Sequence, residues 1–291
     1  MRSLAALTLA TLLSLVSAGA DTNRFTQAVR QAADYSRKGL QREAEATAAE
    51  ALSILDSSDG TPHFDVAAGL NTLATLAYAQ GDLGRAEELF RRSREAYEMI
   101  VGPEDPRLAT VLFNLAGVYV EQRKYTQALS LYRQVLAMRE KALGSADPLL
   151  AEVWNDLGFL CLHLGRYKEA ESWLVKAVDV WEKTRGSEAY SAVALENLAL
   201  LRRIEGRFEA AESLYTRALA VEEKVFGREH PEVATTLMSL AALYRARADA
   251  ERAVETYRRA LALLERTLGA EDPLSVEVRK QLRELAGAAR K

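Results

Sequence analysis

The chain has 291 residues, of which 49% are hydrophobic and 27% charged, so it can bury a large core and is neither a disordered tail nor a low-complexity polypeptide. The 38 Lys and Arg residues against 41 Asp and Glu residues give a net charge of −3, which excludes the long-range attraction to phosphate on which general nucleic-acid binding depends. Cys161 is the only cysteine, so no internal disulfide can form and stability must come from packing.

Residues 1–20 have the pattern of a secretory signal peptide. Arg2 supplies a positive start, an apolar run extends from Leu4 to Ala18, and Ala18-Gly19-Ala20 offers a cleavage site of the A-x-A kind. The apolar run is shorter than the roughly 20 residues that span a bilayer, which favours cleavage over a retained anchor. We therefore expect an exported protein, periplasmic or secreted, that has no stable membrane insertion once the signal is removed.

Residues 21–59 predict a degenerate helix pair that resembles the units after it. Six positions lie 42 residues before corresponding positions of the next unit: Ala32, Tyr35, Gly39, Ala44, Ala48 and Ala51. The match is weaker than that between the later units, so this segment is interpreted as a divergent first copy.

Residues 60–268 contain five copies of one unit. Glycines recur every 41 or 42 residues, which is too regular for isolated turns: they are Gly60, Gly102, Gly144, Gly186, Gly227 and Gly269. Four of them are followed by a pair typical of a helix start, in which Asp or His caps the helix and Pro opens its first turn. These pairs are Asp105-Pro106, Asp147-Pro148, His230-Pro231 and Asp272-Pro273.

Each copy predicts two antiparallel amphipathic helices. Apolar residues are spaced three and four apart in each half, and a glycine such as Gly165 or Gly206 lies between the halves. Small residues recur where we expect the two helices to approach closely: Ala116, Gly158, Ala199 and Ala241. Arg202 stands where two other copies have Tyr, and the sequence leaves open whether it marks a bent interface or a salt bridge.

Residues 269–291 predict a final helix from Pro273 to Arg290. It is rich in Lys, Arg and Glu, as the end of a stack of repeats that faces water should be. We interpret this segment as a C-terminal capping helix.

The order of Leu, Gly or Ala, Tyr, Ala, Tyr or Phe and Ala in each copy resembles the tetratricopeptide repeat family. The 42-residue period and turns such as Arg166 to Glu171 are similar to the longer repeats of kinesin light chains. The resemblance implies an all-α fold, a right-handed superhelical α-solenoid of antiparallel helix pairs. It also implies a non-catalytic scaffold that binds a partner polypeptide or extended peptide in the concave groove.

In such solenoids the first helix of each pair lines the inner surface, so residues of these helices outside the packing pattern are candidates for binding. One small polar residue precedes the second Leu of each first helix: Thr72, Asn114, Asp156, Asn197 and Ser239. Neighbouring positions complete the candidate peptide-binding groove: Phe113, Asn155, Glu196, Met238, His163 and Arg203. Amides and hydroxyls at regular intervals can pair with the backbone of an extended peptide. The alternative is that they only solvate a partly exposed helix face.

The sequence contains no pattern of a catalytic, metal or cofactor site. His63, His163 and His230 lack metal-ligand spacing, and no phosphate-binding loop, nucleotide fingerprint or G-x-S-x-G motif occurs. Cys161 lies among apolar neighbours and is interpreted as a buried small residue. We therefore predict no enzyme activity and no cofactor.

Two other roles stay open at this stage. The chain is a regulatory or sensor subunit of a larger complex, or a structural element that associates with itself, and the sequence does not set the number of chains in the assembly. A motor light-chain role is disfavoured because no long heptad segment is present and an exported protein would not meet a motor.

Overall fold

A computed structural model describes residues 21–57, 63–144, 147–184 and 186–288. The expected signal peptide at 1–20, the first repeat glycine Gly60 and the last three residues lie outside this part of the chain. In the described part the regular structure is helical, without strands.

The chain divides into two compact units, residues 1–144 and 145–291. The N-terminal unit contains a helix at 21–37, then α2 (Gln41–Asp56), α3 (Phe64–Ala79), α4 (Leu83–Val101), α5 (Leu108–Glu121) and α6 (Tyr125–Leu143). The C-terminal unit contains α7 (Leu150–His163), α8 (Tyr167–Lys183), α9 (Glu188–Ile204), α10 (Phe208–Val225), α11 (Pro231–Ala246), α12 (Ala250–Thr267) and α13 (Pro273–Ala288).

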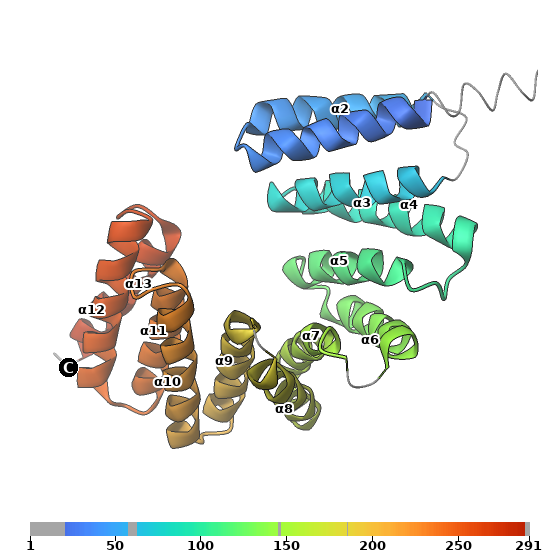
Figure 1. The fold of residues 1–291 in the computed structure, drawn as a ribbon. Coiled ribbons are helices and arrows are strands. Elements are labelled where there is room, and N and C mark those ends of the chain that lie inside the picture. The colour runs from blue at the N-terminus through green and yellow to red at the C-terminus, as the bar shows by residue number, and fades with distance from the viewer. Residues whose placement is uncertain (1–20, 58–62, 145–146, 185, 289–291) are drawn as a thin grey trace, which may run out of the picture. The chain divides into compact units, whose positions relative to one another are not determined.

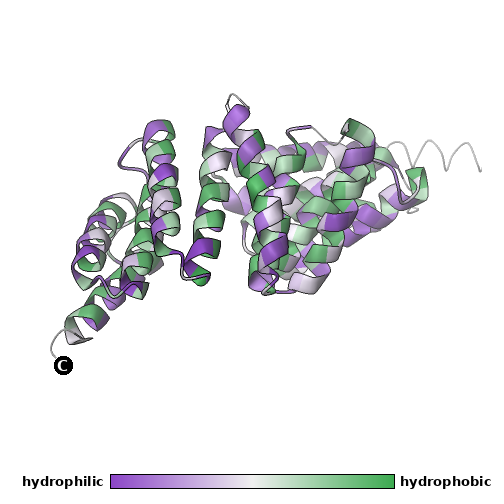
Figure 2. Cartoon of the chain, turned by 90° about the horizontal axis from the view of Figure 1, so that it is seen from below, coloured by the Kyte–Doolittle hydropathy of each residue, from purple (hydrophilic) through white to green (hydrophobic). Residues whose placement is uncertain are grey.

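Consecutive helices form antiparallel hairpins that stack side by side within each unit (Figure 1). In the N-terminal unit α3 packs on α4 and α5 on α6, and α4 joins the two hairpins by packing on α5. In the C-terminal unit the hairpins are α7–α8, α9–α10 and α11–α12, and α13 packs on α12. Most helices have one hydrophobic and one hydrophilic side (Figure 2), so stacking buries the apolar sides that a single hairpin would expose. The all-α solenoid predicted from the sequence is confirmed.

The repeat glycines end the second helix of each pair as predicted. Gly102, Gly144, Gly186, Gly227 and Gly269 have φ between 83° and 99°, and Gly165 and Gly206 have φ of 70° and 74° in the turns inside hairpins. Because Cβ disfavours this left-handed region, glycine is the residue best suited to these reversals.

Two of the predicted helix starts differ in detail from the expectation. α11 and α13 begin at their prolines, but α5 begins at Leu108 and α7 at Leu150, two residues after Pro106 and Pro148. The carboxylates still act locally, since Asp105 Oδ1 accepts the N–H of Arg107 at 3.0 Å and Asp147 Oδ1 that of Leu149 at 2.8 Å. The Asp-Pro pair therefore forms a turn that precedes the regular helix.

The close approach of helices within each hairpin is also observed. Ala116, Ala199 and Ala241 are fully buried. At Gly158 a Cβ would lie 2.5 Å from Leu174 Cγ, closer than van der Waals contact allows. The small residues thus allow the helix pairs to close.

Arg202 is the case that the sequence left open, and it forms salt bridges. Its guanidinium is largely buried and pairs with Glu171 of α8 and, at 2.9 Å, with Glu205. The charge that replaces an aromatic ring is therefore paired between neighbouring hairpins.

Candidate functional site

The predicted groove residues lie on the first helices of the hairpins, as expected, but they are divided between the two units. Thr72 is on α3, and Phe113 and Asn114 are on α5, in the N-terminal unit. The other eight are in the C-terminal unit: Asn155, Asp156 and His163 on α7, Glu196, Asn197 and Arg203 on α9, and Met238 and Ser239 on α11.

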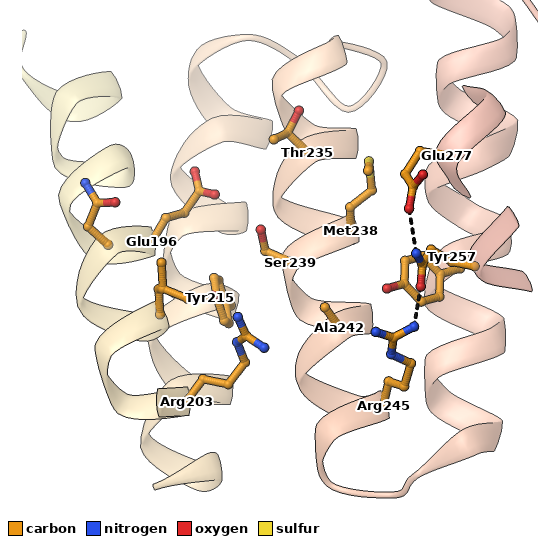
Figure 3. A pocket seen from close by; sticks show the side chains of 13 residues that line it. Glu196, Arg203, Tyr215, Thr235, Met238, Ser239, Ala242, Arg245, Tyr257 and Glu277 are labelled. Carbon is orange, nitrogen blue, oxygen red and sulfur yellow. Dashed lines mark hydrogen bonds between the residues drawn. The ribbon is translucent and has the colours of Figure 1, made fainter. Parts of the chain in front are cut away.

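The C-terminal unit has an open cavity of about 480 Å³ between α9, α11 and α13 (Figure 3). Five of the predicted residues line it: Glu196, Asn197, Arg203, Met238 and Ser239. Figure 3 shows Glu196 and Arg203 on α9 opposite Met238 and Ser239 on α11. We call this cavity the α9–α11 groove.

Sequence reasoning missed the floor and one wall of the α9–α11 groove. Tyr215 of α10 and Tyr257 of α12 form the floor, and Arg245, Glu277 and Gln281 form the wall toward α13. The two tyrosines belong to the apolar repeat pattern, which indicates packing rather than binding, and the composition of the segment that forms α13 indicated only a cap. The 42-residue spacing does extend to α13, because Pro273 follows Pro231 by 42 residues and Gln281 follows Ser239 by the same interval. The sequence therefore carried a signal for this wall, which the interpretation of α13 as a cap left unused.

Arg203 is the charged group of the groove with an unmet hydrogen-bonding requirement. Among the described residues its Nε atom is buried and has no hydrogen-bond partner. Other atoms of the guanidinium lie near the Tyr215 hydroxyl, and burial raises the pKa of this phenol to about 12 despite the opposing charge of Arg203. Tyr215 therefore stays a neutral hydroxyl beside the Arg203 guanidinium.

The wall toward α13 is held by a chain of polar contacts. Arg245 Nη1 donates to Gln281 Oε1, and Gln281 Nε2 donates to Glu277 Oε1 at 2.5 Å. Glu284 Oε2 lies 3.4 Å from Arg245 Nη1. The charge of Arg245 is thus already balanced inside the protein, in contrast to that of Arg203.

The asparagines of the predicted ladder form pairs between hairpins. Asn197 Nδ2 donates to Asn155 Oδ1 at 3.0 Å, and in the other unit Asn114 Nδ2 donates to Asn71 Oδ1 at 3.2 Å. Asn155 in turn donates to Asp156 Oδ1 at 3.3 Å. Each amide that was predicted to face a peptide therefore already links one first helix to that of the preceding hairpin. An Asn side chain has further donor and acceptor capacity beyond one such bond.

The remaining predicted residues lie outside the α9–α11 groove and make local contacts. The Thr72 hydroxyl donates to Ala68 O at 3.1 Å. Phe113 contacts Tyr132 edge-on at 5.2 Å and lies under the Arg139 guanidinium, 4.8 Å from the ring centre. His163 packs on Phe159 with ring centres 4.4 Å apart.

Glu196 is half-buried at the groove and belongs to a carboxyl cluster that extends behind it to the buried Glu222 and Thr236. Its carboxyl group lies within hydrogen-bonding reach of Glu222 of α10, and Thr236 Oγ1 of α11 is 2.9 and 2.7 Å from the two oxygens of Glu222. Burial, reinforced by Glu222, raises the pKa of Glu196 to about 8. Burial also raises the pKa of Glu222, against the lowering effect of the Thr236 hydroxyl. At neutral pH this cluster therefore holds a proton.

The described residues contain no group of three or more His, Cys, Asp and Glu side chains arranged to hold a metal ion. In the same part of the chain, no helix combines the length and apolar character needed to cross a bilayer. Cys161 is buried, as its neighbours predicted. His230 caps α11, since its Nδ1 accepts the N–H of Glu232 at 3.3 Å.

The chain belongs to the tetratricopeptide repeat family. The family pattern matches residues 65–141, 149–220 and 190–266, and a second tetratricopeptide pattern matches residues 113–183. This confirms the resemblance on which the predicted fold depended. No match to a curated protein sequence was found.

Solved structures with low sequence identity share the fold. One is a putative kinesin light chain from Podosopora anserina with nearly identical tetratricopeptide-like repeats, at 22% identity and a TM-score of 0.57, covering 68% of this chain and 94% of the other. Another is BtubC (BKLC) from P. vanneervenii, at 20% identity and a TM-score of 0.59, covering 87% and 94%. A third is PilF of Pseudomonas aeruginosa, at 18% identity and a TM-score of 0.55, covering 90% and 99%.

Proposed function

We propose that the protein is a non-catalytic interaction scaffold that binds an extended peptide segment of a partner protein in the α9–α11 groove. Membership of the tetratricopeptide repeat family supports the scaffold role, because stacked helix pairs leave a surface on which partners bind. The observation that carries the proposal is the α9–α11 groove, in which Arg203 offers an unpaired Nε beside exposed polar and apolar side chains.

The groove favours a peptide with one acidic and one apolar side chain. A carboxylate would supply the acceptor that Arg203 Nε lacks, and a charged hydrogen bond of this kind is stronger than one between neutral groups. Leu200 and Met238 offer an apolar contact on the facing helices. The hydroxyls of Ser239 and Thr235 lie beside them and can pair with a peptide backbone.

We also propose export, to the periplasm or outside the cell, because residues 1–20 carry the pattern of a signal peptide. N-terminal sequencing of the mature protein from the native envelope and secreted fractions tests this. A mature chain that starts at Asp21 supports export, and a chain that retains residues 1–20 in the cytoplasm contradicts it.

Peptide binding is tested with a peptide array followed by titration of a captured peptide that contains Asp or Glu. We expect Arg203→Met to weaken binding by about tenfold or more, because the loss of one charge-assisted hydrogen bond is worth roughly 1.5–3 kcal/mol. Methionine keeps the length and apolar stem of the side chain, so packing changes little.

Arg258→Met is the matched control, since Arg258 is exposed on α12 and does not line the α9–α11 groove. Equal affinities for the R203M and R258M variants would show that the peptide does not use the α9–α11 groove. Failure of every peptide to bind would refute the proposed function itself.

A further inference from the structure

The Glu196–Glu222–Thr236 cluster departs from the repeat pattern at every one of its positions. Phe113, Asn155 and Met238 stand where this repeat has Glu196. Tyr97, Arg139, Trp181 and Leu264 stand where it has Glu222, and Val111, Val153 and Ala194 stand where the last repeat has Thr236. Two acidic residues, on α9 and α10, thus stand where these other repeats have none, and one hydroxyl, on α11, stands where they have an aliphatic side chain.

The geometry requires a proton between the two carboxyl groups. Glu222 is only 3% exposed, and its carboxyl oxygens face the Thr236 hydroxyl and the Glu196 carboxyl rather than water. Two carboxylates side by side in this setting repel each other, whereas a protonated Glu196 donates its O–H to the Glu222 carboxylate. The Thr236 hydroxyl donates its own proton to the same carboxylate, so two hydrogen bonds to Glu222 join groups of α9, α10 and α11.

Other charged and titratable groups around the cluster do not replace that proton. The titratable groups that interact with Glu196 or Glu222 are Tyr215 of α10, Glu232 of α11 and His230 at the N-cap of α11. The negative charge of Glu232 raises the pKa of Glu222, and the His230 imidazole lowers it. From α7, the neutral Asn155 amide accepts from Asn197, the residue after Glu196 in the chain.

We infer that the proton shared by Glu196 and Glu222 is a clasp that holds α9, α10 and α11 together, and that its loss in mildly alkaline solution opens the α9–α11 groove. The clasp itself rests on the cluster geometry. Its effect on the α9–α11 groove rests also on the proposed function, because Glu196 lines the cavity in which the peptide is placed.

The sign of the pH dependence follows from the raised pKa of Glu196. The folded chain keeps a proton up to about pH 8, whereas the unfolded chain releases it near the ordinary value of 4.5. The stabilising contribution is therefore complete below about pH 4.5 and declines as pH rises to about 8, beyond which it is absent.

Denaturant unfolding of the full chain without ligand tests the clasp. We expect the wild-type unfolding equilibrium constant to rise on the order of a hundredfold from about pH 5 to about pH 9 relative to that of Glu196→Gln. The amide introduced by this substitution can still donate to Glu222 but has no proton to lose, so the pH profile of the variant should be flatter. Glu222→Gln should flatten the profile too, because it removes the neighbouring negative charge.

Glu188→Gln is the matched control, since Glu188 is an exposed residue at the start of the same helix. Its profile should parallel that of the wild type. Parallel profiles for wild type and E196Q would overturn the clasp. Carbon-13 NMR of wild-type glutamate carboxyls is a second measurement that needs no variant: a carboxyl that titrates near pH 8 supports the clasp, and the absence of any titrating above about pH 6 overturns it.

A binding experiment separates the clasp from the peptide proposal. With a peptide captured at about pH 6.5, affinity should fall by about tenfold at pH 8.5 for the wild type and change little for E196Q. Equal loss in both proteins would exclude control of the α9–α11 groove by this proton. If no peptide binds at either pH, the proposed function fails, while the unfolding experiment still decides whether the clasp exists.

Discussion

Two turns inside hairpins adopt a backbone conformation that suits glycine but contain other residues. Arg123 has φ of 58° and Ala248 has φ of 62°, whereas the same turns elsewhere contain Gly165 and Gly206. A non-glycine residue in this region crowds its Cβ against the following carbonyl, at a cost of roughly 1–2 kcal/mol. The hairpin is maintained there because its two helices pack along their whole length, which overrides the local preference.

Ala248→Gly should therefore stabilise the protein. The relief of strain exceeds the extra entropy that glycine gives the unfolded chain, so we expect a gain of about 0.5–1 kcal/mol in the free energy of unfolding. Ala246→Gly, at the last residue of α11, should have the opposite effect by a smaller amount, because glycine costs less at a helix end than in its middle. Urea titration of both variants measures this, and a loss of stability in A248G would show that the turn is not strained.

At the scale of helices, the asparagines that the sequence predicted only as groove residues also form hydrogen bonds between hairpins. Asn197 lines the α9–α11 groove and also links α9 to α7 through Asn155. Asn155 is 8% exposed and does not line the cavity. The two partners of one hydrogen bond thus differ in their access to a ligand, which allows stability and binding to be separated.

Asn155→Ala and Asn197→Ala should each destabilise the protein by about 1 kcal/mol, because both remove the hydrogen bond between these residues; N155A also removes the longer bond to Asp156 and should cost somewhat more. Only N197A should also lower the affinity for a captured peptide, by about fivefold or more, since it removes an amide that faces the cavity. Chemical denaturation and peptide titration on the same samples check both parts. Equal peptide affinity for the two variants would limit Asn197 to a structural role.

The repeat pattern predicted the helices well and the α9–α11 groove in part, for physical reasons that differ. Helix pairs follow from glycine periodicity and apolar spacing, which are local properties of the chain. Five groove residues followed from the same register, because they repeat with it. Arg245 and Gln281 lie in that register too, 42 residues after Arg203 and Ser239, but α13 was interpreted only as a cap, and the hydrogen bond between these two residues becomes visible only in the fold.

The Glu196–Glu222 cluster had a signal in the sequence that was passed over. Glu222 stands at a position occupied by Tyr97 and Trp181 in other repeats, and an acidic residue at such a packing position indicates a buried charge that must find a partner. Glu196 was selected only as a groove residue. Its pairing with Glu222 joins consecutive helices across the hairpin, which the alignment of repeats alone does not reveal.

For the whole molecule, the stability of each hairpin depends on its contacts with the neighbouring hairpins. A local packing defect should therefore destabilise the adjacent hairpins and have little effect on distant ones. Gly158 is a suitable place to create such a defect in the C-terminal unit, because Leu174 stands where three other hairpins pair Tyr with Ala: Tyr132 with Ala116, Tyr215 with Ala199, and Tyr257 with Ala241. An added methyl group at 158 would meet Leu174 Cγ at 2.5 Å and Cδ2 at 2.6 Å.

We expect Gly158→Ala to destabilise the protein by about 1–3 kcal/mol through overpacking. The double variant G158A/L174Y should recover most of that loss, since it recreates the Ala–Tyr pair of the other hairpins. Hydrogen exchange measured by mass spectrometry should show faster exchange in α7 to α10 of G158A, and unchanged exchange in residues 21–57, which lie in the other unit. Equal acceleration along the whole chain would mean that the array unfolds as one cooperative block and would contradict nearest-neighbour coupling in this solenoid.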